Sequence, residues 1–214
     1  MGSDKLTMML GQLPVLARTL KVFQASPEVT EIVVVTRMDK LEETAELCKR
    51  FGIEKVTRVI AGGKTRTESA LAGVSEVDAS AKLIAIHDGA RPLVTEDLIL
   101  RTVAAASEHM AAAPALASTD TLKAVDEEGR IIGTVDREHT VRIQTPQVFQ
   151  SDLIKGALTK AVEKELTLTD DCLAAEMMGV KVKTVLGDEQ NLKITTPLDM
   201  ILATEILKQR GEAL

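Results

Sequence analysis

The sequence predicts an α/β fold built on a mostly parallel, doubly wound sheet, and two features support this prediction. Short apolar runs rich in β-branched residues alternate along the chain with segments of helical periodicity, an order typical of parallel strands joined by crossover helices. These runs lack alternation of polar and apolar residues, so we expect helices on both faces of the sheet. At 214 residues, the chain is long enough for one domain with a full core.

The individual elements follow from the positions of these runs and of their caps. Strands are expected at 31–36, 56–61, 82–87, 113–117 and 181–186, and helices at 14–25, 39–51, 66–74, 95–110, 152–162, 170–178 and from 197 onward. Thr95 is a favourable N-cap and Pro197 suits a first helical turn. We expect a loop at 144–149 and an edge strand at 191–197.

A β-hairpin is expected where two short strand-like stretches, 119–125 and 130–135, flank Asp126-Glu-Glu-Gly129. The residues of this hairpin do not form a second apolar face that could pack against the rest of the domain. We therefore expect residues 118–140 to project as an arm from a single domain spanning 1–214. A second subunit is the simplest partner for such an arm, which predicts a homodimer.

Composition excludes several classes of function. Hydrophobic residues make up 45% of the chain and charged residues 27%, as in ordinary globular proteins, and the net charge of −6 disfavours binding to nucleic acid. No apolar run approaches the roughly 20 residues that a membrane-spanning helix requires, and we expect no signal peptide. Cys48 and Cys172 are isolated thiols, a usage that fits a reducing cytoplasm rather than a disulfide framework.

The most informative segment is 82–92, in which an apolar run ends in His87-Asp88-Gly89-Ala90-Arg91-Pro92. In open α/β sheets, ligands bind beyond the carboxyl ends of the strands. An acid and an arginine three residues apart can serve a metal-bound phosphate and a second anionic group. The alternative is an ordinary strand-to-helix turn with a weak surface ion pair.

A second candidate loop, Ala61-Gly62-Gly63-Lys64-Thr65-Arg66-Thr67-Glu68-Ser69, lies between a predicted strand and a predicted helix. Paired glycines allow close approach of the backbone to a ligand, and the N-terminus of a helix attracts anions. The alternative is a plain turn in which Thr or Ser caps the helix.

The remaining motifs are weak one by one: Asp120-Thr121-Leu-Lys123, Thr134-Val-Asp-Arg137, Gln144-Thr145-Pro-Gln147, Thr169-Asp170 and Asn191-Leu-Lys193-Ile-Thr. Together with the two loops, in this order, they resemble the 2-C-methyl-D-erythritol 4-phosphate cytidylyltransferase family, from Lys5 almost to the C-terminus. The resemblance implies a Rossmann-like nucleotidyltransferase sheet. It also implies a reaction of CTP with 2-C-methyl-D-erythritol 4-phosphate that yields 4-diphosphocytidyl-2-C-methyl-D-erythritol and pyrophosphate, with Mg²⁺ as cofactor.

The same resemblance implies roles for individual residues. Lys5 is expected to be catalytic and to contact the triphosphate. The residues expected to bind the nucleotide are Gly62, Gly63, Arg66, Ser69, Asp88 and Gly89. Asp88 is also expected to bind the metal. Substrate binding is expected from Arg91, Thr121, Arg137, Thr145, Thr169 and Lys193. Thr121 and Arg137 lie in the arm, so they are expected to complete the active site of the neighbouring subunit.

One departure from the family pattern concerns the start of the chain. The family has an N-terminal strand and a Gly-rich turn ending in Arg-Met, whereas this sequence begins at the Met of that turn. We expect upstream residues in the native protein, and little CTP binding or turnover without them. Two alternatives stay open: a ribitol 5-phosphate cytidylyltransferase, and a non-catalytic nucleotide-binding homologue. A nicotinamide dehydrogenase is disfavoured because the chain has no GxGxxG motif.

Overall fold

The computed structural model describes residues 5–212 and confirms the α/β class. Its α-helices are α1 (Val15–Ala25), α2 (Leu41–Arg50), α3 (Arg66–Ser75), α4 (Glu96–His109), α5 (Ser151–Glu163), α6 (Cys172–Met177) and α7 (Pro197–Gln209). The strands are β1 (Met9–Leu10), β2 (Leu13–Pro14), β3 (Ile32–Thr36), β4 (Val56–Ala61), β5 (Leu83–Ile86), β6 (Ala111–Ala117), β7 (Lys123–Val125), β8 (Ile131–Thr134), β9 (Val141–Ile143), β10 (Gln147–Gln150) and β11 (Lys183–Leu186). Short 3₁₀ turns occupy Met38–Lys40 and Arg137–His139.

The larger sheet within residues 5–212 has the order β11–β6–β10–β5, with β9 paired to the C-terminal part of β6. Strands β5, β6 and β11 share one direction, and β9 and β10 run opposite to it. The sheet is therefore mixed, and the expected loop at 144–149 is wrong for the part that forms β10. Only two of the four β10 residues are apolar and Pro146 precedes them, so the segment lacked the sequence signal of a strand.

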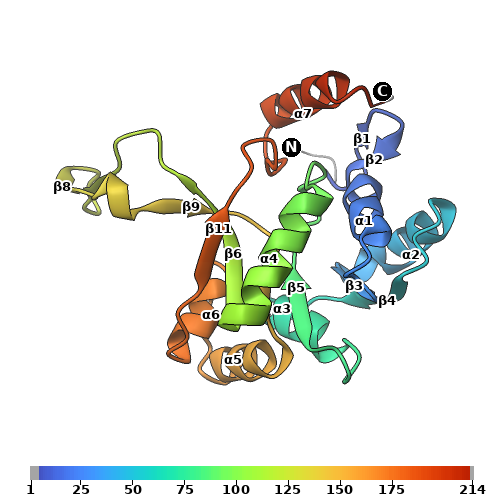
Figure 1. The fold of residues 1–214 in the computed structure, drawn as a ribbon, viewed down its shortest axis with the longest axis horizontal. Coiled ribbons are helices and arrows are strands. Elements are labelled where there is room, and N and C mark those ends of the chain that lie inside the picture. Colours follow the sequence, from blue (N-terminus) through green and yellow to red (C-terminus); the bar gives the residue numbers. More distant parts are fainter. Residues whose placement is uncertain (1–4, 213–214) are drawn as a thin grey trace.

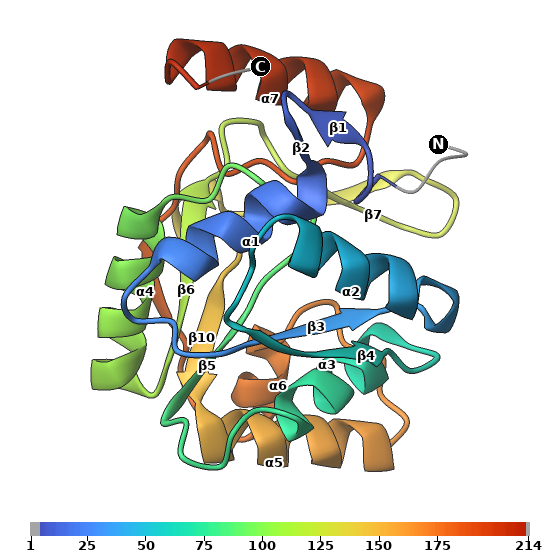
Figure 2. The same cartoon turned by 90° about the vertical axis from the view of Figure 1, so that its right-hand side faces the viewer.

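The parallel pair β3–β4 forms a separate sheet. Figure 2 shows it between α2 and α3, running across the view, whereas β5 and β10 run steeply. No ladder among the described residues joins β3 to β5.

Helices cover both faces of the larger sheet, as the apolar runs predicted. Helix α4 packs on β5, β6, β10 and β11 from one side, and α5 and α6 pack from the other, with α3 against α5 (Figure 1). Thr95 caps α4 by accepting a hydrogen bond from the backbone N–H of Leu98. Helix α7 begins at Pro197 within a capping box formed by Thr196 and Asp199.

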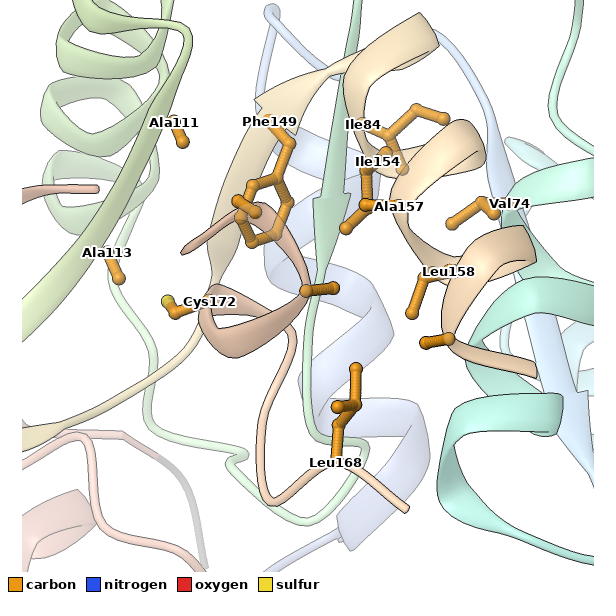
Figure 3. Packing of buried hydrophobic residues seen from close by; sticks show 13 residues of the cluster. Val74, Ile84, Ala111, Ala113, Phe149, Ile154, Ala157, Leu158, Leu168 and Cys172 are labelled. Atoms are coloured by element: carbon orange, nitrogen blue, oxygen red, sulfur yellow. The ribbon is translucent and has the colours of Figure 1, made fainter. Parts of the chain in front are cut away.

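The main core lies between the sheet and α5–α6 and centres on Phe149 (Figure 3). Phe149 of β10 is fully buried and pairs across the sheet with Ile84 of β5 and Ala111 of β6. Its neighbour Val148 points to the opposite face, where it packs with Ala112 and Ala106. This alternation anchors β10 and so fixes the loop that precedes it, which belongs to the site described below.

Strands β7 and β8 pair only with each other among the described residues and form a hairpin that extends away from the rest of the chain (Figure 1). Almost all residues from 119 to 143 are exposed, including the apolar side chains of Val125, Ile131 and Ile132. Such apolar exposure on a thin hairpin is typical of a surface that packs against another molecule.

None of the helices in residues 5–212 has both the length and the apolar character needed to cross a bilayer.

Candidate active site

Asp88 lies between two cations directly after β5. Its carboxylate accepts a hydrogen bond from Arg91 Nε at 3.1 Å and another from Lys193 Nζ at 3.0 Å. Lys193 comes from the segment before α7, more than a hundred residues away in sequence. The predicted edge strand at 191–197 is absent: these residues form an irregular segment, held because Ile194 N–H donates to the Ala90 carbonyl at 2.8 Å.

The charge state of Asp88 follows from these neighbours. Burial acts to raise the pKa of its carboxyl group, but Lys193 and Arg91 outweigh that effect, so the pKa lies below its usual value. The carboxylate is therefore ionised at neutral pH. It can accept from the cations of the site or bind a divalent metal that arrives with a polyphosphate.

The backbone of the 88–91 loop has all its carbonyl groups engaged. The Asp88 carbonyl accepts from Arg91 N–H, and the Gly89 carbonyl accepts from Thr19 Oγ1. The Ala90 carbonyl accepts from Ile194 N–H, and the Arg91 carbonyl lies 3.3 Å from His87 Nε2. In contrast, the amide N–H groups of Gly89 and Ala90 have no hydrogen-bond partner in the part of the chain that is described. Unpaired amides beside an acid flanked by cations suit an anionic ligand.

Gly89 packs closely against the N-terminal segment. A Cβ atom at Gly89 would lie 3.2 Å from Leu16 Cδ1 and 3.6 Å from Leu6 Cδ2. Lys5 precedes Leu6 and is partly buried. Lys5 is therefore the sequence neighbour of a residue that packs close to the loop presenting Asp88, and its catalytic role stays a prediction.

Arg91 is directed by a buried asparagine. Its Nη1 donates to the backbone carbonyl of Asn191 at 2.6 Å, and the Asn191 side chain donates from Nδ2 to the Thr145 carbonyl at 2.9 Å. Arg91 Nη2 has no partner among the described residues, so one edge of the guanidinium can meet an anion. Thr145 itself is buried, and its hydroxyl accepts from the Asp88 N–H at 3.1 Å. This hydrogen bond fixes the start of the 88–91 loop.

The second predicted loop joins β4 to α3. Thr65 caps α3 by accepting from Glu68 N–H, and Glu68 Oε2 accepts from Lys64 N–H at 2.6 Å. Ser69 Oγ accepts from Gly63 N–H at 3.1 Å. The loop is therefore a capped turn, as the alternative expected, and its two glycines lie close to the start of α3; nucleotide binding by this loop stays a prediction.

Glycine is required at position 63 because a Cβ atom there would lie 2.3 Å from Glu68 Cβ. We expect Gly63→Ala to open the loop and, if the CTP that the family resemblance implies binds here, to raise the KM for CTP about tenfold, equivalent to about 1.4 kcal/mol of binding, with kcat little changed. Steady-state kinetics with varied CTP measures this. Gly156→Ala is the matched control, since a Cβ atom at Gly156 would meet no neighbouring group within 4 Å; an equal rise in that variant would contradict the explanation.

Arg66, the first residue of α3, forms a two-point ion pair with Asp171. Its Nη1 and Nη2 lie 2.9 Å and 2.5 Å from the two carboxylate oxygens, and the Asp171 side chain is fully buried. Burial raises the pKa of Asp171 above its usual value, against the opposing effect of Arg66. The pair ties the glycine loop to the segment that contains Thr169.

Removing Arg66 leaves a buried carboxylate without its partner. We expect Arg66→Met to lower the free energy of unfolding by about 3 kcal/mol at pH 8. The pKa of Asp171 is already raised and rises further without Arg66, so the folded state binds the proton more tightly than the unfolded chain. The loss must therefore shrink as the pH falls toward 5. Urea unfolding at the two pH values measures this.

Two further variants serve as controls for Arg66→Met. Arg66→Met/Asp171→Asn removes both charges and should recover most of the loss. Arg58→Met breaks an exposed pair with Glu76 and should cost less than about 1 kcal/mol. A loss in Arg66→Met that does not depend on pH would contradict the ion-pair explanation.

The remaining residues predicted for the site are Thr169, before α6, and Thr121 and Arg137, in the arm. Thr169 is exposed on the loop before α6; the adjacent Asp170 accepts from Gln147 Nε2 at 3.2 Å and from Leu173 N–H at 3.2 Å. Thr121 and Arg137 are exposed on the arm, and Arg137 Nη1 donates to the Thr119 carbonyl at 3.3 Å. Within one chain, no described hydrogen bond or ion pair joins the arm residues to Asp88.

Sequence reasoning missed the buried polar residues that hold the site together. Asp171 and Asn191 stand inside or beside the recognised motifs, but nothing in their spacing indicates burial or partners. Gln147 is similar: its Oε1 accepts from the N–H groups of Asp171 and Cys172 at 2.9 Å and 3.1 Å. Of the three, Gln147 alone has apolar neighbours on both sides in the sequence, Pro146 and Val148, and that is a weak signal of burial.

A glycine loop after β4, and unpaired amides and a carboxylate between two cations after β5, are typical of one class: nucleotidyltransferase-like α/β proteins, which handle phosphates at the carboxyl ends of their strands. The model of the 2-C-methyl-D-erythritol 4-phosphate cytidylyltransferase family matches residues 1–209. The chain belongs to this family of nucleotidyltransferase enzymes.

Individual relatives agree with that assignment. The chain is 41% identical to the 2-C-methyl-D-erythritol 4-phosphate cytidylyltransferase of Geobacter metallireducens, with 97% of this chain and 90% of that protein covered. It is 40% identical to that of Caldanaerobacter subterraneus, covering 96% and 91%. The crystal structure of 4-diphosphocytidyl-2C-methyl-D-erythritol synthase from Anaerococcus prevotii superposes with a TM-score of 0.87 at 33% identity, covering 95% and 93% of the chains. The Thermus thermophilus cytidylyltransferase gives 0.79 at 30% identity, covering 97% and 95%.

Proposed function

We propose that the protein transfers the cytidylyl group of CTP to 2-C-methyl-D-erythritol 4-phosphate, releasing pyrophosphate, in the synthesis of isoprenoid precursors. The observation that supports this most directly is Asp88 ionised between Arg91 and Lys193, beside two unpaired amide groups. Two phosphate-bearing substrates need that mixture of charges. Family membership supports the identity of both substrates.

The reaction needs positioning more than acid–base chemistry. A phosphate group of the second substrate attacks the α-phosphorus of CTP, and the pyrophosphate leaves on the opposite side. A phosphate monoester is already an anionic nucleophile, so no strong base is required, and the protein lowers the barrier by orienting the groups and neutralising charge. In this proposal Lys5 neutralises the triphosphate, while Arg91, Lys193 and Thr169 bind the polyol phosphate.

Asp88 is also the residue that fits a magnesium ion. No group of three or more potential metal-binding side chains occurs among the described residues. That suits Mg²⁺, which commonly binds one or two carboxylates, waters and substrate phosphates. When bound with CTP, the ion would neutralise phosphate charge; Asp88 would hold it next to the loop amides.

The cytosine is proposed to lie at the glycine loop, with Gly62, Gly63, Arg66 and Ser69. Close backbone approach at Gly62 and Gly63 allows hydrogen bonds to the exocyclic amine, and unpaired buried polar groups penalise uracil. Gly89 allows the ribose and phosphates to approach Asp88.

The arm is proposed to form a homodimer in which Thr121 and Arg137 complete the partner's site. Their exposure, and the exposed Val125, Ile131 and Ile132 beside them, support this arrangement. We place the reaction in the cytoplasm, in keeping with the two buried free thiols, Cys48 and Cys172.

Pyrophosphate release tests this function, using the protein as its gene encodes it with Mg²⁺, CTP and each of two polyol phosphates. We expect at least tenfold higher kcat/KM with 2-C-methyl-D-erythritol 4-phosphate than with ribitol 5-phosphate, at least a hundredfold preference for CTP over UTP, and loss of activity with EDTA. Higher efficiency on ribitol 5-phosphate would overturn the substrate assignment. No pyrophosphate from either substrate would favour the non-catalytic alternative.

A further inference from the structure

His87 is a titratable residue inside the site that has no role in the proposed chemistry. It follows β5 directly, and its ring packs on Phe23 of α1, with the ring centroids 4.8 Å apart. Its Nε2 lies 3.3 Å from the Arg91 carbonyl and its Nδ1 lies 3.0 Å from Thr145 Oγ1. Both ring nitrogens therefore meet protein atoms.

These contacts define which nitrogen carries the proton. A carbonyl oxygen only accepts, so Nε2 must donate to Arg91. Thr145 Oγ1 already accepts from the Asp88 N–H at 3.1 Å, and its own proton can go to an unprotonated Nδ1. A ring with its proton on Nε2 and a bare Nδ1 satisfies every donor and acceptor in this chain of contacts.

The contacts join both ends of the Asp88–Arg91 loop to one side chain. At the start of the loop, Thr145 receives the Asp88 amide; at its end, His87 holds the Arg91 carbonyl. In between, Arg91 N–H donates to the Asp88 carbonyl at 3.0 Å. Because the side chains of Asp88 and Arg91 are proposed to serve different substrates, the shape of this loop sets the distance between those substrates.

We infer that His87 is a positioning residue for cytidylyl transfer: with its proton on Nε2, it bridges Thr145 and the Arg91 carbonyl and holds the side chains of Asp88 and Arg91 at a fixed spacing. This inference rests on the proposed function. It goes beyond that function by assigning a positioning role to a side chain that the proposed chemistry does not use. A displacement of about 1 Å in such groups can cost about a hundredfold in rate.

Nitrogen-15 NMR of histidine-labelled protein at pH 7.5 tests the tautomer without any substrate. We expect the His87 pattern of a single tautomer, with Nε2 protonated and Nδ1 bare. His109 and His139, which are exposed, supply the comparison within the same spectrum. A ring that carries a proton on Nδ1 would overturn the inference.

Kinetics of three variants test the role. His87→Phe keeps a ring against Phe23 and removes both hydrogen bonds; we expect kcat about a hundredfold lower, with both KM values within threefold. His87→Gln keeps a side-chain N–H that can donate to the Arg91 carbonyl, so its kcat should be at least tenfold higher than that of His87→Phe. Thr145→Val breaks the same bridge, so His87→Phe/Thr145→Val should be little worse than His87→Phe alone.

His109→Gln is the matched control and should keep full activity. Urea unfolding of each variant separates a positioning effect from lost stability, and His87→Gln keeps the test valid if His87→Phe does not fold. Full kcat in a folded His87→Phe variant, or losses that multiply in the double variant, would contradict the positioning role. An inactive wild-type protein would instead refute the proposed function, while the NMR result would still decide the tautomer.

Discussion

Replacing Asp88 with asparagine is expected to lower kcat/KM about a thousandfold, equivalent to about 4 kcal/mol of transition-state stabilisation. The change removes the carboxylate that is proposed to hold the metal. It also leaves Arg91 and Lys193 without the anion between them, so both side chains lose their fixed positions. Loss of one preorganised electrostatic group commonly costs a hundredfold to a thousandfold, and Asp88 combines two such roles.

The control for Asp88→Asn is Asp97→Asn. Asp97 also pairs with an arginine, Arg101, but 82% of its side chain is exposed. This control should keep activity within twofold of the wild-type value. Activity of Asp88→Asn within tenfold of wild type, at equal stability, would show that the reaction occurs elsewhere.

The second large effect concerns the arm. We expect Ile131→Asp/Ile132→Asp to convert a dimer of twice the 23.0 kDa chain mass into a monomer, because it places two charges where both side chains expose about two thirds of their surface. Activity should fall at least a hundredfold, since each site loses the partner's Thr121 and Arg137. Light scattering coupled to size-exclusion chromatography measures the mass. Met178→Asp, a similar change at an exposed position directly after α6, should remain dimeric.

Subunit mixing separates a shared site from a merely structural arm. Asp88→Asn and Arg137→Ala homodimers should each be nearly inactive. A mixed dimer contains one site with both residues intact, so mixing should restore up to about a quarter of the wild-type activity per subunit. Failure of exchanging subunits to restore activity would contradict the completion of each site by its partner.

The strands and helices that could be predicted from sequence are those whose local signal and tertiary environment agree. The run at β5 is apolar and ends abruptly at His87; α4 has both its N-cap at Thr95 and its amphipathic pattern. β10 could not be predicted, because Gln147 and Gln150 bracket only two apolar residues. Its stability comes from β5 and β6 on either side, which local sequence does not describe.

The site could be predicted in its charged residues but not in their partners. Asp88 and Arg91 stand three apart, so their pairing followed from sequence; Lys193 came only from the family resemblance, and its contact with Asp88 needs the fold. Asp171 and Asn191 are fully buried, and burial of a polar residue depends on partners distant in the chain. The roles of Thr121 and Arg137 depend on a second subunit and remain predictions.

The most direct test of the central claim follows the oxygen atoms of the substrate phosphate. 2-C-methyl-D-erythritol 4-phosphate labelled with ¹⁸O in its phosphate group would be incubated with CTP, Mg²⁺ and the protein as its gene encodes it, and the products read by ³¹P NMR and mass spectrometry. Attack of that phosphate on the α-phosphorus of CTP predicts a cytidine diphosphate product with ¹⁸O in the bridge between its two phosphorus atoms, and pyrophosphate without label. Label in the pyrophosphate, or a CTP-dependent product with no labelled bridge, would contradict this account.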